Sequence, residues 1–180
     1  MPTKISAPQP DEYHDYYGGY IRNALAREDA FESLSQQIEE IRTALGSLTN
    51  EQALFRDAPK EWTIKEVLGH INDVERVFAY RMLCISRNEK TPLPGFEQDN
   101  YVRESSFNAC PIQDLILEFD FLRRANTLTI RNMSEDALLR CGTASGFPFS
   151  ARALIYAMIG HVDHHMQSLH EKYLPVAVTL

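Results

Sequence analysis

WTIKEVLGHINDVERVFAYR, from Trp62 to Arg81, gives the clearest indication of the fold class of this chain. Its apolar side chains recur every three or four residues, which is the period of one face of an α-helix. They are Val67, Ile71, Val74 and Phe78, and the series continues with Met82 and Ile85. Thr63 and Glu66 fit a capping box at the start. The stretch therefore predicts one long amphipathic helix over residues 63–88.

Three further segments have the same helical period, over residues 29–48, 111–132 and 150–173. In the first of them the apolar residues follow the spacings of a coiled-coil seam. They are Leu34, Ile38, Ile41, Leu45 and Leu48. Pro111 suits the first position of the next helix, and Ser150 is a favourable N-cap for the last. Together with residues 63–88, these segments predict an all-α four-helix bundle.

The connection between the second and third predicted helices, residues 89–109, is long and is broken by Pro92, Pro94 and Gly95. A loop of this length inside a compact domain is usually a crossover connection or a functional lid. The other two connections are shorter. We therefore expect one long crossover, with the second and third helices parallel and the second and fourth antiparallel.

The 180 residues, with 44% hydrophobic and 24% charged side chains, suggest a single globular domain. We place this domain at residues 11–180. The first ten residues contain Pro2, Pro8 and Pro10, and we expect them to form a flexible N-terminal arm. Tyr13, Tyr16, Tyr17 and Tyr20 follow. They fit a short helical lead-in packed on the bundle or, alternatively, the mouth of a pocket.

The net charge of -7 disfavours nucleic acid as the main partner, because phosphate binding needs clustered Lys and Arg. No apolar run approaches the roughly 20 residues that a membrane span requires. The N-terminal residues lack the apolar core of a signal peptide. We therefore expect a cytoplasmic protein with no membrane partner.

Four of the six histidines lie in two short windows: His70 in VLGHINDVER, and His161, His164 and His165 in GHVDHHMQSL. His161 and His165 are four residues apart, so both lie on one face of a helix. They occupy seam positions where apolar residues are usual. His70 lies about seven residues after one helix start and His165 about eight before another helix end, so antiparallel helices would bring them to the same height.

Three neutral imidazoles from His70, His161 and His165 would suit a divalent metal and leave coordination positions open. Zinc, nickel, iron and manganese all accept such ligands, and the sequence does not distinguish them. The alternative is a group of ordinary core or surface histidines. We favour the metal site, because burying three imidazoles without partners is costly.

Glu66 and Asp73 lie one turn from His70 and are candidates to orient its ring or to reach the metal. For Glu66 we favour the capping role instead. We expect Asp163 to be solvated. Asp73, Glu75, Arg76 and Arg81 fit a solvated helix face with paired charges.

Three motifs together resemble the DinB-like superfamily of metal-dependent proteins: WTIKEVLGHINDVERVFAYR, LPGF at 93–96 and GHVDHHMQSLHEKYL. The resemblance implies a four-helix bundle of up-down-down-up topology. It also implies a divalent metal held by three histidines, which by motif matching are His70, His161 and His165. His164 matches a position that is often His in the family without being a ligand.

Members of that superfamily include metal-dependent transferases and isomerases that use low-molecular-weight thiols. We therefore expect an enzyme acting on a small molecule, by thiol transfer or hydrolysis, with a thiol as a candidate cosubstrate and the LPGF loop closing the pocket. No catalytic side chain is assigned. The alternative is a non-catalytic metal-binding module in stress response or structure. We expect a homodimer in either case.

Overall fold

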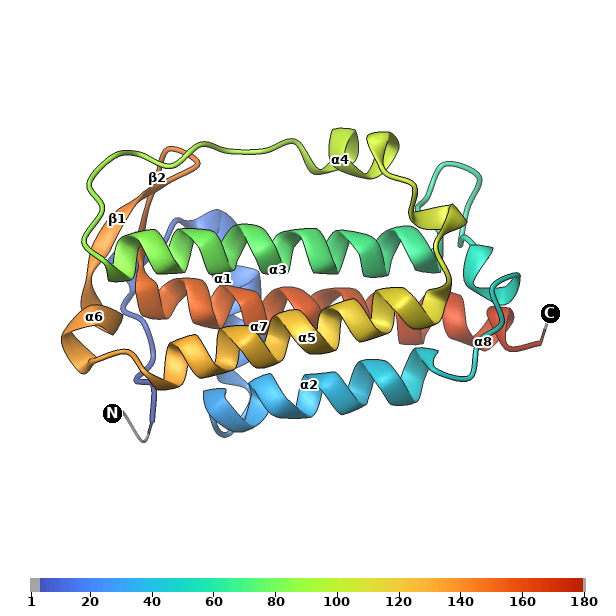
Figure 1. Cartoon of the computed structure of the whole chain (residues 1–180), viewed down its shortest axis with the longest axis horizontal. Coiled ribbons are helices and arrows are strands. Elements are labelled where there is room, and N and C mark those ends of the chain that lie inside the picture. The colour runs from blue at the N-terminus through green and yellow to red at the C-terminus, as the bar shows by residue number, and fades with distance from the viewer. Residues whose placement is uncertain (1–3, 180) are drawn as a thin grey trace.

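The computed structural model describes residues 4–179, and four long helices make up most of it (Figure 1). All four predicted helices are present, within a few residues of their predicted ends. They are α2 (Ala30–Leu45), α3 (Ile64–Ser86), α5 (Ile112–Arg131) and α7 (Ala151–Ser168). The chain is therefore mostly helical, as the hydrophobic periodicity predicted.

Side-chain caps explain where three of these helices begin. Asp29 accepts hydrogen bonds from two backbone amides of the first turn of α2. The capping box of Thr63 and Glu66 is formed at α3, and Ser150 accepts from the Ala153 amide at α7. Each cap satisfies amides that have no partner within the helix.

Shorter elements surround the long helices. The helices are α1 (Gly18–Leu25), α4 (Gln98–Glu104), α6 (Glu135–Leu139), α8 (Leu174–Ala177), the 3-10 turns η1 (Pro10–Glu12), η2 (Asp15–Tyr17), η3 (Gln52–Leu54) and η4 (Phe107–Ala109), and the π-helical turn η5 (Leu169–Tyr173). The tyrosine-rich segment thus contains the predicted helical lead-in, α1, which packs on α7.

The structure also contains a small sheet, which corrects the prediction of a purely helical fold. Strands β1 (Cys141–Ala144) and β2 (Phe147–Ser150) pair antiparallel. Ser145 and Gly146 turn the hairpin with φ angles of 54° and 80°, the left-handed conformations that a tight two-residue turn needs. Leu93 hydrogen-bonds to the backbone of Thr143 and Ser145. The hairpin therefore anchors the start of the connection from α3 to α5, which continues along α3 and carries α4 (Figure 1).

Two hydrophobic clusters fill the bundle, one towards the hairpin and one towards the opposite end. Between them lies a layer of buried polar side chains to which every long helix contributes. Its members are Gln37, Glu75, Arg123 and His161, from α2, α3, α5 and α7. This polar layer places buried charges and one of the candidate ligands at mid-height in the bundle.

The described part of the predicted N-terminal arm is packed on the bundle. Ile5 is 1% exposed, and the Tyr156 hydroxyl donates a 2.9 Å hydrogen bond to its carbonyl oxygen. Glu12 accepts hydrogen bonds from Ser150 and Arg152. The buried side chains of Ile5 and Pro8 and a half-buried ion pair thus attach residues 4–12, while residues 1–3 lie outside the described chain.

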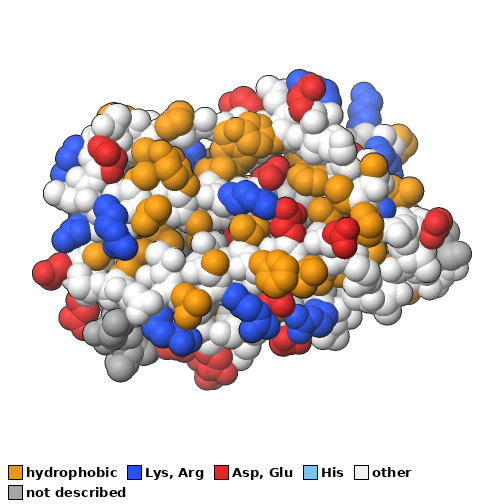
Figure 2. Space-filling model, viewed as in Figure 1, with side chains coloured by type: hydrophobic (Ala, Val, Ile, Leu, Met, Phe, Trp, Pro, Cys, Tyr) orange, Lys and Arg blue, Asp and Glu red, His pale blue; other side chains and the backbone are white. Residues whose placement is uncertain are grey.

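The outer face of α5 exposes three large apolar side chains, from Leu117, Phe121 and Leu128. Figure 2 shows hydrophobic side chains scattered between charged ones on this side of the molecule. The predicted homodimer stays a prediction. Within residues 4–179, no helix combines the length and the apolar character needed to cross a bilayer.

Candidate metal centre

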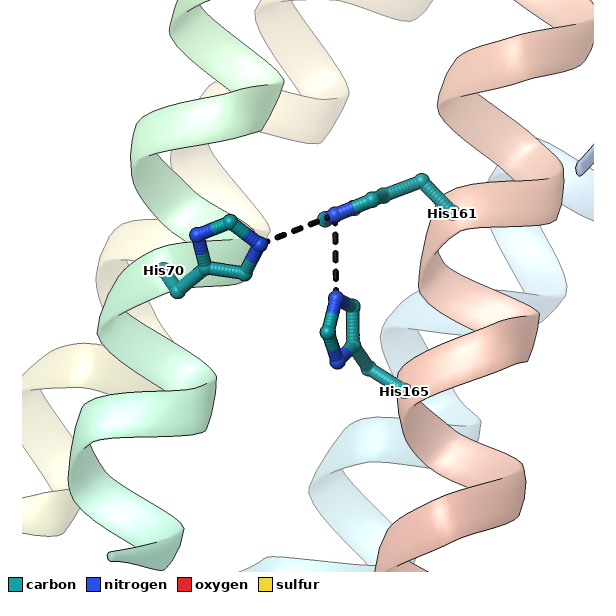
Figure 3. A group of neighbouring side chains, drawn as sticks. All are labelled: His70, His161 and His165. Carbon is teal, nitrogen blue, oxygen red and sulfur yellow. Dashed lines mark hydrogen bonds between the residues drawn. The ribbon is translucent and has the colours of Figure 1, made fainter. Parts of the chain in front are cut away.

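The structure brings His70, His161 and His165 together between α3 and α7 (Figure 3). The Nε2 atom of His161 lies 3.1 Å from Nε2 of His70 and 3.1 Å from Nε2 of His165. One potential ligand nitrogen from each of the three rings lies within 4.8 Å of the others. The i and i+4 spacing on α7 supplies two of them, and α3 supplies the third.

Hydrogen bonding alone does not account for this arrangement. An imidazole nitrogen carries either one hydrogen or one lone pair, so it makes one good hydrogen bond. Nε2 of His161 faces two nitrogens at equal distance. Nitrogens bound to one tetrahedral zinc ion at about 2.05 Å would lie about 3.3 Å apart. The donor set and its spacing therefore fit a cation shared by all three rings.

Burial keeps these rings neutral. Loss of solvent and, to a smaller extent, neighbouring histidines lower the pKa of His70 to about 4 and that of His165 to about 3. Burial also lowers the pKa of His161 well below its usual value. Because a metal binds the neutral imidazole, the lone pairs are available at neutral pH.

Residues 33–169 match the family model described as the DinB superfamily. The chain belongs to the DinB superfamily. The fold is similar to that of YfiT from Bacillus subtilis, with a TM-score of 0.72 at 14% identity over 94% of this chain and 93% of that one. YfiT is described as "a probable metal-dependent hydrolase with an unusual four-helix bundle topology". No curated protein matches the sequence.

In this DinB-superfamily bundle a glycine precedes each of two candidate ligands and allows close packing beside it. A Cβ at Gly160 would lie 1.7 Å from the Tyr20 carbonyl oxygen, so α1 could not approach α7 as it does. A Cβ at Gly69 would lie 2.4 Å from the Phe107 ring. The Gly-His pairs in the sequence are therefore a packing signal as well as a ligand signal.

The neighbouring polar residues take other roles. His164 is exposed and is not among the three converging rings. Glu66 caps α3 and accepts a hydrogen bond from Asn108. The Oδ1 atom of Asp73 lies 3.9 Å from Nη1 of Arg76. In the described part of the chain neither Glu66 nor Asp73 hydrogen-bonds to His70.

Two charged groups that the sequence suggested were solvated are paired inside the DinB bundle, one of them buried and the other half-buried. Glu75 pairs with Arg123 in the polar layer, at 1% and 0% side-chain exposure. Asp163 binds Arg27 and Gln37 and is only 17% exposed. Their partners lie far away in sequence, so helix periodicity along one segment could not reveal them.

Arg81 is a further correction, since it is 2% exposed rather than solvated. Together with Asp73 and Arg76, it was expected on a solvated face of α3. Arg76 is indeed half exposed and pairs with Glu118. The two arginines lie five residues apart on α3, so they point in different directions from the helix.

Two cavities reach the histidine cluster, one on each side of α4. The first, of about 540 Å³, includes His161 in its wall together with several Tyr and Phe side chains and some charged and polar ones. The second, of about 570 Å³, includes His165 and is more polar, with Lys60 and Arg103 in its wall. Gln98 and Asp99 of α4 line both cavities. The start of α4 therefore borders two openings, one that leads to His161 and one that leads to His165.

The walls of the first cavity include both segments that sequence patterns singled out. Tyr16, Tyr17 and Tyr20 form one side, so the tyrosine cluster is a pocket wall as well as part of a helical lead-in. Gly95 and Phe96 of the LPGF segment form another side. These positions agree with a loop that covers a pocket.

Proposed function

We propose that this protein is a divalent-metal enzyme whose His70, His161 and His165 hold the metal next to a small-molecule pocket. A metal ion bound by three histidines supplies a Lewis acid that lowers the pKa of a water or thiol in its open position. The convergence of three neutral Nε2 atoms on one point, beside two cavities, is the observation that carries the proposal.

The bundle topology is part of the proposal. An up-down-down-up arrangement, with the long crossover between α3 and α5, makes α3 antiparallel to α7. Antiparallel neighbours place a residue near the start of one helix opposite a residue near the end of the other. This agrees with the pairing of His70 with His165 and His161.

The surrounding residues have separable roles. The burial that keeps the imidazoles neutral also removes water from one side of the site. Aromatic side chains from α1, α3 and the LPGF segment shape the first cavity. The α4 segment over the histidine cluster separates the two routes of approach.

Two reaction types follow from this arrangement. Hydrolysis is supported by the fold's similarity to a protein described as "a probable metal-dependent hydrolase". Transfer to a low-molecular-weight thiol is supported by the two cavities, because a reaction between two small molecules needs two binding places. A non-catalytic structural site is less well supported, since structural zinc sites are normally closed by four protein ligands.

Metal analysis of the purified protein tests the ligand set. We expect one metal equivalent in the wild type and in the matched control His164→Ala, and none in His70→Ala or His165→Ala. Full retention in either of the last two variants would remove that residue from the ligand set.

Turnover tests the enzymatic part separately. Esters and amides test hydrolysis, and electrophiles mixed with a small thiol test transfer. Activity should exceed that of His70→Ala and vanish on chelation. The structural alternative would be supported if the wild type keeps its metal, shows no more turnover than His70→Ala, and has a lower Tm after chelation.

A further inference from the structure

Arg81 is a buried cation that has no carboxylate partner. It is 2% exposed, and its Nη2 donates to the Pro94 carbonyl at 2.9 Å and to the Ser145 hydroxyl at 2.7 Å. Both acceptors are neutral. Among residues 4–179, no carboxylate lies within salt-bridge distance of it.

Arg123 shows what a purely structural buried arginine looks like in the same bundle. It is 0% exposed and is fully matched by Glu75 and Gln37. A buried charge without a counter-ion is expensive, so such a group is normally paired or functional. Arg81 has no such partner within the described chain, so we expect an anionic group of another molecule to pair with it.

Arg81 is also placed to meet such a group. It lies in the wall of the aromatic cavity of about 540 Å³ that includes His161. Its guanidinium carbon lies 5.9 Å from the centre of the Phe96 ring. Within the described chain its hydrogen bonds of ordinary geometry both come from Nη2, and the Tyr17 hydroxyl is a further, weaker partner of the guanidinium. The Tyr17 hydroxyl partly offsets the lowering of Arg81's pKa that burial causes.

The cavity wall indicates the kind of molecule. Tyr17, Tyr20, Phe78, Phe96 and Phe147 offer aromatic surface, which suits an apolar or aromatic body. Pro94 and Ser145 already use the Nη2 hydrogens of Arg81, so a carboxylate would accept charge-assisted hydrogen bonds from Nε or Nη1. One cation among aromatic rings suits a singly charged carboxylate better than a phosphate dianion, which usually needs several donors. Glu97 and Asp99 at the cavity edge are exposed, so solvent screens their repulsion.

We propose that Arg81 binds the carboxylate of an elongated small molecule whose apolar body fills the aromatic cavity and whose other end reaches the histidine cluster. The last part rests on the proposed metal-enzyme function, whereas the binding of a carboxylate by Arg81 does not. Arg81 is eleven residues from His70 on α3, about 16 Å along the helix axis. A molecule that contacts both sites must therefore be extended.

The carboxylate can belong to either reactant, the electrophile or the thiol, and binding measurements separate the two. The probes are 3-phenylpropanoate, its neutral amide, and N-acetylcysteine, added to the metal-free full chain and followed by calorimetry or NMR. We expect at least one of the two carboxylates to bind wild type at least tenfold more tightly than the amide does. Binding of 3-phenylpropanoate alone assigns the carboxylate to the electrophile, and binding of N-acetylcysteine alone assigns it to the thiol.

Variants of two arginines on α3 test the role of Arg81. Arg81→Lys should weaken carboxylate binding about tenfold and Arg81→Gln should abolish it. Arg76→Gln, the control from the solvated side of α3, should leave it unchanged. Arg81→Met should keep or raise the Tm while it loses binding, which an arginine kept for stability would not do.

The proposal is overturned if neither carboxylate binds at millimolar concentration, if the amide binds wild type as tightly as the carboxylates, or if Arg81→Gln binds like wild type. Metal content keeps this result apart from the metal-enzyme proposal. Arg81→Gln should retain its metal, and His70→Ala should retain carboxylate binding. A wild-type protein that binds a carboxylate but no metal would therefore refute the proposed metal-enzyme function and leave the proposed Arg81 site unaffected.

Discussion

Replacing Glu75 with glutamine is expected to destabilise the bundle by about 3–5 kcal/mol, because it leaves Arg123 as an unpaired charge in the core. Two hydrogen bonds of 2.9 Å join the native side chains, at 1% and 0% exposure. Glutamine has nearly the same volume as glutamate and can still accept from Asn126. The substitution therefore removes a charge while it leaves the packing almost unchanged.

A double substitution separates the value of the pair from the cost of breaking it. Glu75→Leu with Arg123→Met removes both charges and keeps an apolar side chain on each helix. Gln37 and Asn126 then lose hydrogen-bond partners, at a cost of about 1–3 kcal/mol each if they find no others. We nevertheless expect the double variant to be more stable than either Glu75→Gln or Arg123→Met, since each of these leaves one charge buried and unmatched.

The single substitution Glu75→Gln should also weaken metal binding. Arg123 is near enough to His161 to contribute to the lowering of its pKa, and burial is the larger cause. Without the negative charge of Glu75, the guanidinium would also repel a divalent cation on that ring. A loss of about 1.4 kcal/mol corresponds to a tenfold weaker affinity, and we expect at least that much.

Urea unfolding of the metal-free protein, followed by circular dichroism, measures the stability, and calorimetry with Zn²⁺ measures the affinity. Glu39→Gln is the matched control, because its pair with Arg42 is solvent-exposed and should contribute less than about 1 kcal/mol. The reasoning is refuted if Glu75→Gln costs no more than this control. A double variant less stable than both single ones would also contradict it.

Three further outcomes are expected. Gly160→Ala should cost about 1–3 kcal/mol or more in thermal unfolding, because the new Cβ would collide with the Tyr20 backbone, and an unchanged Tm would contradict that close packing. Thr63→Ala should cost about 1 kcal/mol by the same assay through loss of the α3 cap, whereas Thr63→Ser should cost less. The metal-free protein should lose stability as the pH falls below 6.5, because the unfolded chain takes up protons that His70 and His165, with pKa values of about 4 and about 3, do not. Each of these two histidines should account for about 1.6 kcal/mol between pH 6.5 and pH 5 in urea unfolding, and a combined loss below 1 kcal/mol would refute the lowered values.

The helices and part of the candidate site were predictable because their signals are local. Apolar spacing and the caps at Thr63 and Ser150 depend on residues within one or two turns. The i and i+4 relation of His161 and His165 is local as well. His70 could be added to the predicted ligand set because it lies about as far from the start of its helix as His165 lies from the end of the other. That comparison needs only the lengths and directions of the two helices.

The hairpin escaped prediction because its strands have four residues each. Such short strands carry almost no periodicity. Their stability depends on the turn at Ser145 and Gly146 and on hydrogen bonds to Leu93, a residue about fifty positions earlier in the chain. Sequence patterns over a short window do not contain that partner.

Local sequence patterns were enough to predict the four helices, their starting points and the two windows that hold the candidate ligands, because periodicity and capping act within single segments. Which charges are buried depends on how the helices pack. Glu75 and Arg123 find each other across 48 positions, and Arg81 is enclosed by the LPGF segment and the hairpin. A charged residue on a helix looks the same in sequence whether water or another helix faces it. Its role depends on the burial and the counter-ion that packing provides.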